Sequence, residues 1–258
     1  KSTKSIFLKF LMIRWHSFLR MQIKVAKKLN SVIVVSKSSK QDIHDDFGLK
    51  KEAMKVILNG IDTEAFFPDE NIKKIPFRIV TSASSDVPLK GLDYLLEAFS
   101  EVIKIFPDST LQIIGSSKQG GHTSRKINDL NIKEKVQFNN DLSFKEVRDL
   151  YCSADIVVIP SLYEGFGFAV GEAMACRVPV ITTSGGAIPE VIEDCGILVS
   201  PGNSKELEEA MLKLLPDEEK KSFFAEKGFN RIIEHLKWEK VAKLMTESYD
   251  TEINRTTN

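Results

Sequence analysis

The sequence predicts an α/β fold, a doubly wound parallel sheet preceded by part of a second domain. From residue 77 onward, short uninterrupted apolar runs alternate with helical segments, and such runs are typical of strands that helices cover on both faces. The chain has 258 residues, 42% of them apolar, and this length is enough to bury a core without disulfides. Turn-forming sequence around residues 59–75 separates the two parts.

Residues 1–62 are predicted to be a remnant of the second domain together with a hinge. Apolar residues between 6 and 28 are spaced like one face of a helix, and a strand at 31–36, a polar helix at 37–47 and an apolar run at 55–58 follow. Residues 1–58 hold 13 Lys and Arg against 4 Asp and Glu, so they carry +9 and the remainder carries −9. The segment 6–28 is therefore either a domain helix with a solvated basic face or a surface that rests on anionic lipid.

Residues 63–240 are predicted to form the main domain, and 241–258 a C-terminal helix and tail. The clearest helix lies at 92–106, where apolar residues recur every three or four positions before Pro107 stops it. Ligands of such sheets bind where the carboxyl ends of strands lead into helices. Further helices are expected at 204–215, at 217–235 and from Trp238 to about Tyr249. The expected strands are 78–82, 111–115, 136–139, 156–160, 178–182 and 197–199.

The loop after the strand at 156–160 contains the most informative polar residues. Glu164 lies in this loop, Gly165 and Gly167 allow a ligand to approach the backbone, and Glu172 follows on the next helix. The free N–H groups at a helix start attract phosphate, so a carboxylate beside them suits sugar hydroxyls. Eight residues separate the two glutamates, a spacing at which both can face one cleft. Glu190 fits a carboxylate at a helix N-terminus better than a catalytic group.

A second signal is Lys90, which precedes Gly91 at the start of the helix at 92–106. A flexible cation in this place suits a diphosphate, although a lysine before a helix is more commonly solvated. The loop at 115–125 is glycine-rich, and Arg125 and Lys126 make its end basic. It is therefore a candidate to flank a phosphate.

The sequence matches other common motifs of binding and catalytic sites poorly. Residues 165–171 have one residue too many for a dinucleotide fingerprint, and residues 115–120 begin like a P-loop but have Gly121 in the lysine position. No two of the four histidines have metal-ligand spacing. Ser161 and Ser184 lack the G-x-S-x-G context of a nucleophile. The sequence thus predicts no metal site and no serine nucleophile.

Several motifs carry a resemblance to a known family. The E-x7-E arrangement in PSLYEGFGFAVGEAMA, followed by PVITTSGGAIPEVI, resembles the donor-site signature of the GT4 family of retaining glycosyltransferases. The segments VIVVSKSSKQDI, VILNGIDTEAFFP, PLKGLDYLLEAF and DLYCSADIVVIPS resemble further parts of that family, in the same order, between about residues 30 and 200. The resemblance implies a GT-B fold, in which two Rossmann-like domains bind donor and acceptor. It also implies hexose transfer from a UDP-, GDP- or ADP-linked sugar with retention of configuration, without a metal or a further cofactor.

The resemblance also implies roles for particular residues. By position in the motifs, Lys90 would contact the donor diphosphate, Glu164 would lie near the donor sugar and Glu172 would hold the ribose hydroxyls. Lys90 and Glu164 would be the catalytic residues, because catalysis in this class depends largely on stabilising the departing nucleoside diphosphate. The backbone groups expected to receive phosphate or sugar oxygens belong to Gly165, Phe166, Gly167 and Phe168.

Three features depart from the family pattern. Ser85 replaces an arginine that many members have in the donor site, so Arg125 or Lys126 is the candidate for the second cation. Arg177 stands where glycine is usual, and a left-handed backbone there would cost roughly 1–2 kcal/mol. The glycine-rich loop and the histidine of the acceptor domain have no counterpart, so we expect this chain to bind donor without completing transfer. The alternatives are a non-catalytic nucleotide-sugar-binding module and another nucleotide-dependent Rossmann enzyme.

The composition of the chain indicates its cellular compartment and the kinds of partner it has. Three cysteines fit neither a disulfide framework nor a paired metal site, as is typical of cytosolic proteins. No apolar run approaches the roughly 20 residues of a membrane span, and no signal-peptide cleavage site follows residue 28. We predict a cytoplasmic enzyme, and of the two alternatives for 6–28 the lipid-contacting surface would place it at the inner face of the membrane. Membrane contact would suit a lipid or a lipid-linked glycan as acceptor, and a cytosolic small molecule or a protein is the alternative. No nucleic-acid partner is predicted.

Overall fold

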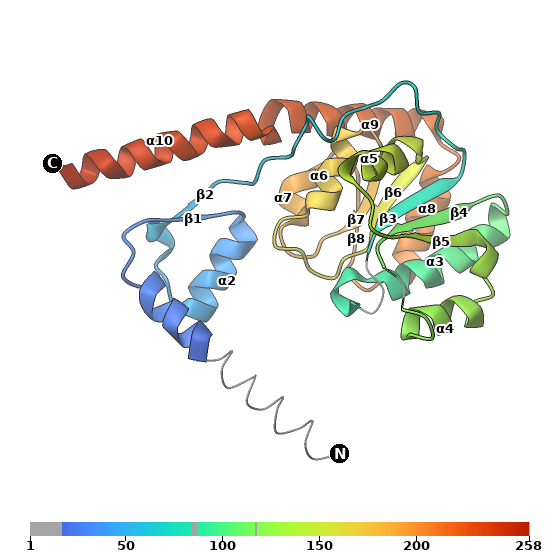
Figure 1. The fold of residues 1–258 in the computed structure, drawn as a ribbon, viewed down its shortest axis with the longest axis horizontal. Coiled ribbons are helices and arrows are strands. Elements are labelled where there is room, and N and C mark those ends of the chain that lie inside the picture. Colours follow the sequence, from blue (N-terminus) through green and yellow to red (C-terminus); the bar gives the residue numbers. More distant parts are fainter. Residues whose placement is uncertain (1–16, 84–86, 117, 258) are drawn as a thin grey trace, which may run out of the picture.

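Two parallel sheets organise the protein in the computed structural model, which describes residues 17–83, 87–116 and 118–257 (Figure 1). The small sheet pairs β1 (Val32–Val34) with β2 (Met54–Val56). The large sheet has six strands in the order β5-β4-β3-β6-β7-β8. This order runs outward in both directions from β3 and β6, so the large sheet is doubly wound, as predicted.

The strands of the large sheet are all parallel and end near the predicted positions. Each predicted strand agrees with the structure to within two residues at either end. Every residue of β6 and β7 is buried, which explains their uninterrupted apolar or threonine-containing sequences. The six strands are β3 (Arg78–Ser82), β4 (Thr110–Ile114), β5 (Val136–Asn139), β6 (Ile156–Ile159), β7 (Val180–Thr183) and β8 (Ile197–Val199).

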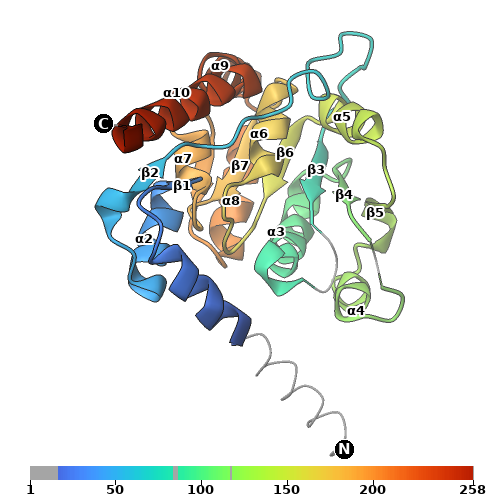
Figure 2. The ribbon, with the colours of Figure 1, turned by 60° about the vertical axis from the view of Figure 1, so that its left-hand side comes forward.

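Helices cover both faces of the large sheet (Figure 2). One face packs against α3 (Leu92–Ile105), α4 (His122–Asp129) and α8 (Ser204–Leu214), whose buried side chains belong to one hydrophobic cluster. The predicted apolar stripe of α3 is buried in this cluster. The other face packs against α5 (Phe144–Ser153), α6 (Phe168–Ala175) and α7 (Ile188–Ile192), which share a second cluster. The next helix, α9 (Glu218–Arg231), packs against α6.

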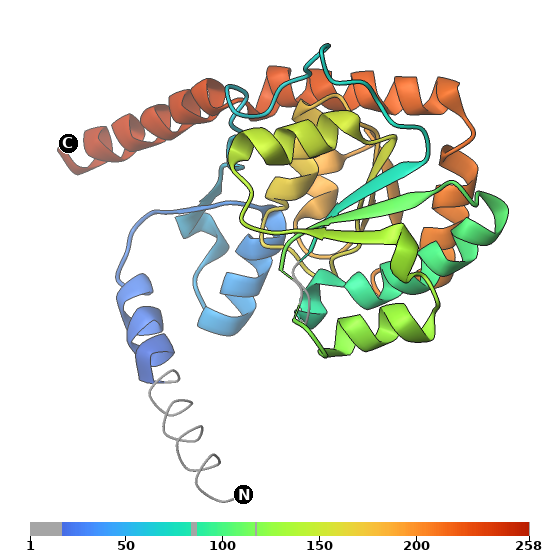
Figure 3. The same cartoon turned by 45° about the vertical axis from the view of Figure 1, so that its right-hand side comes forward.

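The C-terminal helices differ from the predicted ones. The helix predicted at 217–235 is α9, which ends at Arg231 and continues as a π-helical turn over Ile232–Leu236. Lys237 then has extended backbone, which separates this turn from α10 (Trp238–Thr257). The last helix continues past the predicted end near Tyr249 because no glycine or proline interrupts residues 250–257. The predicted boundary at residue 240 falls inside α10, which runs past the large sheet toward the side of the small one (Figure 3).

The predicted amphipathic segment at 6–28 lies only partly within the described residues. Residues 17–26 are helical. Side chains of this helix and of the turn after it are exposed although they are apolar, namely Phe18, Met21, Val25 and Leu29. Among the residues that the structure describes, no helix is long and apolar enough to cross a membrane.

Candidate functional site

Lys90 and Glu164 meet at the carboxyl ends of β3 and β6, which are neighbours in the large sheet. Lys90 closes a 3-10 turn at Pro88–Lys90, and Glu164 lies in the loop after β6. The Lys90 Nζ lies 2.7 Å from the Glu164 Oε1. The buried Ser161 hydroxyl donates to the same oxygen at 2.7 Å. The predicted cation and the predicted carboxylate therefore form one ion-paired cluster.

The two loops that carry this pair run against each other. Gly91 follows Lys90 with φ 65°, and a Cβ added there would lie 2.0 Å from the Pro160 carbonyl oxygen. The Leu162 N–H donates to the Leu89 carbonyl at 2.8 Å. Glycine is needed at residue 91 because the backbone is left-handed and the neighbouring loop touches it.

The loop after β7 supports Glu164 from the other side. The Ala187 N–H donates to the Glu164 carbonyl at 2.9 Å, and Gly186 forms an isolated bridge with Glu164. Gly186 has φ 66°, and a Cβ there would lie 2.2 Å from the Glu164 carbonyl oxygen. The glycine pair of the TTSGGAIPE segment thus lets the β7 loop approach the backbone of Glu164.

The start of α6 offers backbone donors next to this cluster. Gly167 is its N-cap with φ 106°, and a Cβ on the exposed Gly165 would meet nothing within 4 Å. Phe166 is buried edge-on against Phe168, with ring centroids 4.9 Å apart. The N–H groups of Phe168 and Ala169 donate to no acceptor in the described part of the chain. Such free donors at a helix start suit phosphate or sugar oxygens.

Glu172, on α6, has surroundings unlike those of Glu164. Burial raises the pKa of its carboxyl from 4.5 to about 7. Within residues 17–83, 87–116 and 118–257 no hydrogen bond or ion pair reaches this carboxyl. Burial raises the pKa of Tyr151 and of Cys176, and the nearby Glu172 charge raises both further. A mostly buried carboxyl without a partner is typical of a binding or catalytic site.

We expect Glu172→Gln to stabilise the unliganded protein at pH 8 by about 1–3 kcal/mol, because the glutamine removes a buried charge. The folded protein holds the carboxyl proton more tightly than the unfolded chain does. The stability of the natural protein should therefore fall as the pH rises from about 4.5 to about 7. The stabilisation by Glu172→Gln should accordingly vanish near pH 4, where the carboxyl is protonated in both states. Urea unfolding at several pH values measures this, with the exposed Glu247→Gln as control. An equal gain at pH 4 and pH 8 would contradict the pKa assignment.

Neither candidate for the second cation, Arg125 or Lys126, contacts Lys90 through a hydrogen bond or an ion pair in the described residues. Arg125 is exposed on α4, and no hydrogen bond or ion pair connects it to Lys90 or Glu164. The Lys126 Nζ is engaged 2.6 Å from the Glu97 Oε1. Ser85 lies outside the described residues. The second cation of the diphosphate site thus stays a prediction.

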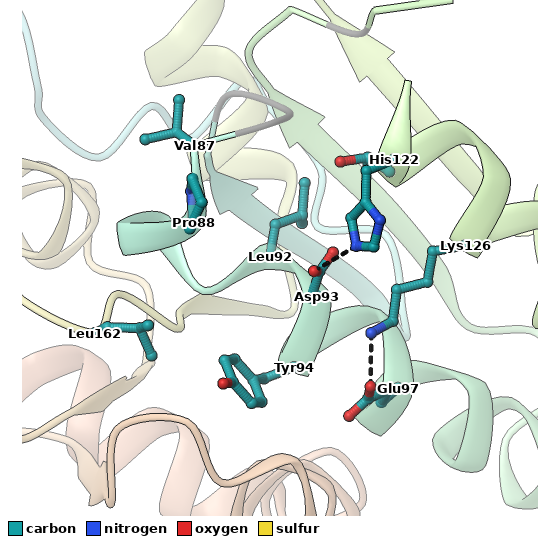
Figure 4. Close-up of a pocket in the computed structure, with 10 residues that line it drawn as sticks. Val87, Pro88, Leu92, Asp93, Tyr94, Glu97, His122, Lys126 and Leu162 are labelled. Carbon is teal, nitrogen blue, oxygen red and sulfur yellow. Dashed lines mark hydrogen bonds and ion pairs between the residues drawn. The ribbon is translucent and has the colours of Figure 1, made fainter. Parts of the chain in front are cut away.

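A pocket of about 410 Å³ lies beside the Pro88–Lys90 turn, between α3 and α4 (Figure 4). Two polar pairs line it: His122 Nε2 lies 2.8 Å from Asp93 Oδ2, and Lys126 pairs with Glu97. Lys126, one candidate for the second cation, lines this pocket, whereas Lys90, Glu164 and Glu172 do not. Among the described residues its lining consists of Val87, Pro88, Leu92, Asp93, Tyr94, Glu97, His122, Thr123, Lys126 and Leu162.

Sequence reasoning missed the roles of Ser161 and of the Glu190 side chain. Ser161 is no nucleophile candidate, but it orients Glu164 from three residues before it. Glu190 lies in the first turn of α7, yet its carboxylate accepts the N–H groups of Lys37 at 2.7 Å and Ser38 at 2.9 Å. It therefore caps the start of α2 (Lys37–Phe47), not only its own helix. No sequence signal identifies a partner about 150 residues away.

The backbone at Arg177 is left-handed, with φ 56°, so the cost considered for a non-glycine residue at this position applies. Its guanidinium lies 4.4 Å from the ring centroid of Phe229, and its Nε lies 3.2 Å from Glu226. These contacts offset part of the backbone cost.

Two family models match the chain, and they meet at the predicted hinge. The model of glycosyl transferases group 1 matches residues 62–231, which are 170 of the 258 residues. The model of glycosyltransferase family 4 matches residues 4–65. This chain belongs to the glycosyl transferases group 1 family. The resemblance drawn from the sequence motifs is thereby confirmed.

A curated relative of this glycosyltransferase chain supports the family assignment. It is 35% identical over 245 residues to the MMP alpha-(1->4)-mannosyltransferase of Mycolicibacterium hassiacum, covering 94% of this chain and 59% of that protein. The chain thus spans about three fifths of the length of this relative.

Solved structures confirm the GT-B fold. Sucrose-phosphate synthase from Thermosynechococcus elongatus matches with a TM-score of 0.80 at 24% identity, over 93% of this chain and 62% of that one. Anabaena HepE in complex with UDP-glucose matches with a TM-score of 0.80 at 22% identity, over 90% of this chain and 67% of that one.

Proposed function

We propose that this chain binds a nucleotide-diphosphate sugar and supplies the donor side of a hexosyltransferase that retains configuration. The observation that carries the proposal is the Lys90–Glu164 pair at the carboxyl ends of β3 and β6. Membership of the glycosyltransferase family supports it. So do the mannosyltransferase relative and the fold shared with HepE, which was solved with UDP, with UDP and glucose, and with UDP-glucose.

The proposal assigns a role in donor binding to each polar group of the site. The Lys90 ammonium contacts the diphosphate and stabilises the charge that develops on the departing nucleoside diphosphate. Glu164, oriented by Ser161, lies beside the donor sugar, and Glu172 accepts hydrogen bonds from the ribose hydroxyls. The free N–H groups at the start of α6 receive phosphate or sugar oxygens. With Lys90 and these amides supplying positive charge, the proposal includes no metal and no further cofactor.

For the acceptor of the whole protein we propose a lipid or a lipid-linked glycan at an anionic membrane surface. The support is the helix at 17–26, whose exposed apolar side chains are spaced three and four residues apart. Basic side chains lie among them, at Arg20, Lys24, Lys27 and Lys28. This combination is typical of helices that lie on membranes.

Calorimetric titration of the full chain with UDP, GDP, ADP and NAD tests the donor proposal. We expect one nucleoside diphosphate to bind, its sugar-linked form to bind as well, and NAD not to bind. Binding of NAD in preference to every nucleoside diphosphate would contradict the proposal in favour of another Rossmann enzyme. Donor binding without transfer by the whole protein, with lipid-linked acceptors supplied, would favour the non-catalytic module.

A further inference from the structure

The helix α2 contacts the donor loop on both sides of Glu164. The Tyr163 hydroxyl donates a hydrogen bond to the Asp42 carboxylate. The Ser39 hydroxyl donates to the Gly165 carbonyl oxygen at 3.5 Å. The residues that flank Glu164 are thus held by two side chains of a helix more than 120 residues away in the sequence.

The helix α2 is itself fixed at its N-terminus. Its first N–H groups bind the Glu190 carboxylate, and a carboxylate at this end of a helix is favourable for the helix dipole. The Ser36 hydroxyl accepts the Ser39 N–H at 2.9 Å and completes the cap.

Glu190 belongs to α7, which a nearly buried arginine holds in place. The Arg231 guanidinium donates to the carbonyl oxygens of Glu190 and Val191, each at 2.6 Å, and pairs with Glu193 at 2.7 Å. The helix α2 is therefore attached to a rigid part of the main domain.

We propose that Ser39 and Asp42 are positioning residues of the donor site. They hold Tyr163 and Gly165 so that Glu164 stays beside Lys90 and the start of α6 keeps its shape. This inference rests on the proposed function, because it assigns α2 a role in donor binding. Asp42 and Ser39 act through the loop: in the described part of the chain, neither forms a hydrogen bond or an ion pair with Lys90 or with the Glu164 side chain.

The physical reason is the cost of ordering the loop. Residues 163–167 contain two glycines, and Tyr163, Gly165 and Phe168 are exposed. A loop that is not held in the free protein must be ordered on binding, and this lowers affinity. Losing one charge-assisted hydrogen bond of an exposed pair corresponds to roughly a three- to tenfold weaker affinity.

Three variants of the full chain test the affinity. Asp42→Ala and Tyr163→Phe each remove one partner of the same hydrogen bond, and Asp45→Ala is the control. Asp45 lies on the same helix, and within the described residues its carboxylate accepts a hydrogen bond only from Gln41, at 2.7 Å. We expect Asp42→Ala and Tyr163→Phe each to weaken nucleoside diphosphate binding three- to tenfold. The double variant should bind no more weakly than either single variant, because both remove the same hydrogen bond. The control should bind like the natural protein, and all variants should melt at similar temperatures.

Hydrogen exchange of the unliganded chain gives a readout that needs no nucleotide. The Leu162 N–H, which donates to the Leu89 carbonyl, and the Ala187 N–H, which donates to the Glu164 carbonyl, should exchange several times faster in Asp42→Ala and Tyr163→Phe, but not in Asp45→Ala. Unchanged exchange would overturn the inference whether or not nucleotides bind. Faster exchange in a chain that binds no nucleotide would support the loop contact and contradict the proposed function instead. Faster exchange with undiminished affinity would show that α2 holds the loop without positioning the donor, and would overturn the inference.

Discussion

Lys90→Ala is expected to weaken nucleoside diphosphate binding by about 10- to 100-fold. A hydrogen bond to a charged group contributes about 1.5–3 kcal/mol, and every 1.4 kcal/mol is a factor of about ten in affinity. The Glu164 side chain is only 18% exposed, and the substitution leaves its carboxylate with Ser161 as its remaining partner among the described residues. Its uncompensated charge would then repel the diphosphate. Calorimetric titration with the nucleoside diphosphate that binds the natural chain measures the loss.

Lys104→Ala is the matched control for Lys90→Ala. Lys104 lies on α3, is exposed and, in the part of the chain that the structure describes, pairs only with Glu101 on the same helix. Its removal should therefore leave nucleotide affinity unchanged. Combining Lys90→Ala with Glu164→Gln separates the two effects, because the repulsion then disappears and part of the affinity should return. Undiminished affinity of Lys90→Ala would remove Lys90 from the site.

Asp155→Ala is expected to lower the free energy of unfolding by about 3–5 kcal/mol, since it breaks a buried ion pair and leaves one charge behind. Asp155 and Lys221 are 7% and 5% exposed, and the Lys221 Nζ lies 2.7 Å from the Asp155 Oδ1. The other carboxylate oxygen accepts the Phe77 N–H at 2.9 Å. This pair lies where β6 begins, at the opposite end of the sheet from Glu164. Urea unfolding at pH 7 measures the change.

Glu218→Ala is the comparison for Asp155→Ala, because it removes the other carboxylate of Lys221. The Glu218 side chain is 85% exposed, so solvent screens its charge and its removal should cost no more than about 1 kcal/mol. The double variant Asp155→Ala with Lys221→Met should recover part of the lost stability, because no charge stays buried. Equal, small losses for Asp155→Ala and Glu218→Ala would mean that Lys221 keeps its charge solvated without Asp155. Nucleotide affinity should be unchanged in every one of these folded variants.

Sequence patterns were sufficient to predict the strands and most helices of the main domain, and the loops that carry polar residues. The apolar stripe of α3 and the uninterrupted apolar run of β6 could be predicted because each follows from the pattern of apolar residues within the element itself. The length of α10 and the π-helical turn at Ile232–Leu236 were not predicted, because helix ends depend on weak local preferences and on packing. The GT-B fold and the candidate roles of Lys90, Glu164 and Glu172 came from motif resemblance, not from periodicity.

Which of these residues contact one another depends on the three-dimensional fold. Lys90 and Glu164 lie 74 positions apart and pair because β3 and β6 are neighbours in the sheet. Glu190 caps α2, and Asp42 binds Tyr163, across still longer separations. Burial without a partner, which raises the pKa of Glu172 to about 7, is likewise a property of the packed helix and its neighbours. Local sequence patterns encode which face of an element is buried, whereas the partner of a polar group depends on strand order and on the way distant loops fold against each other.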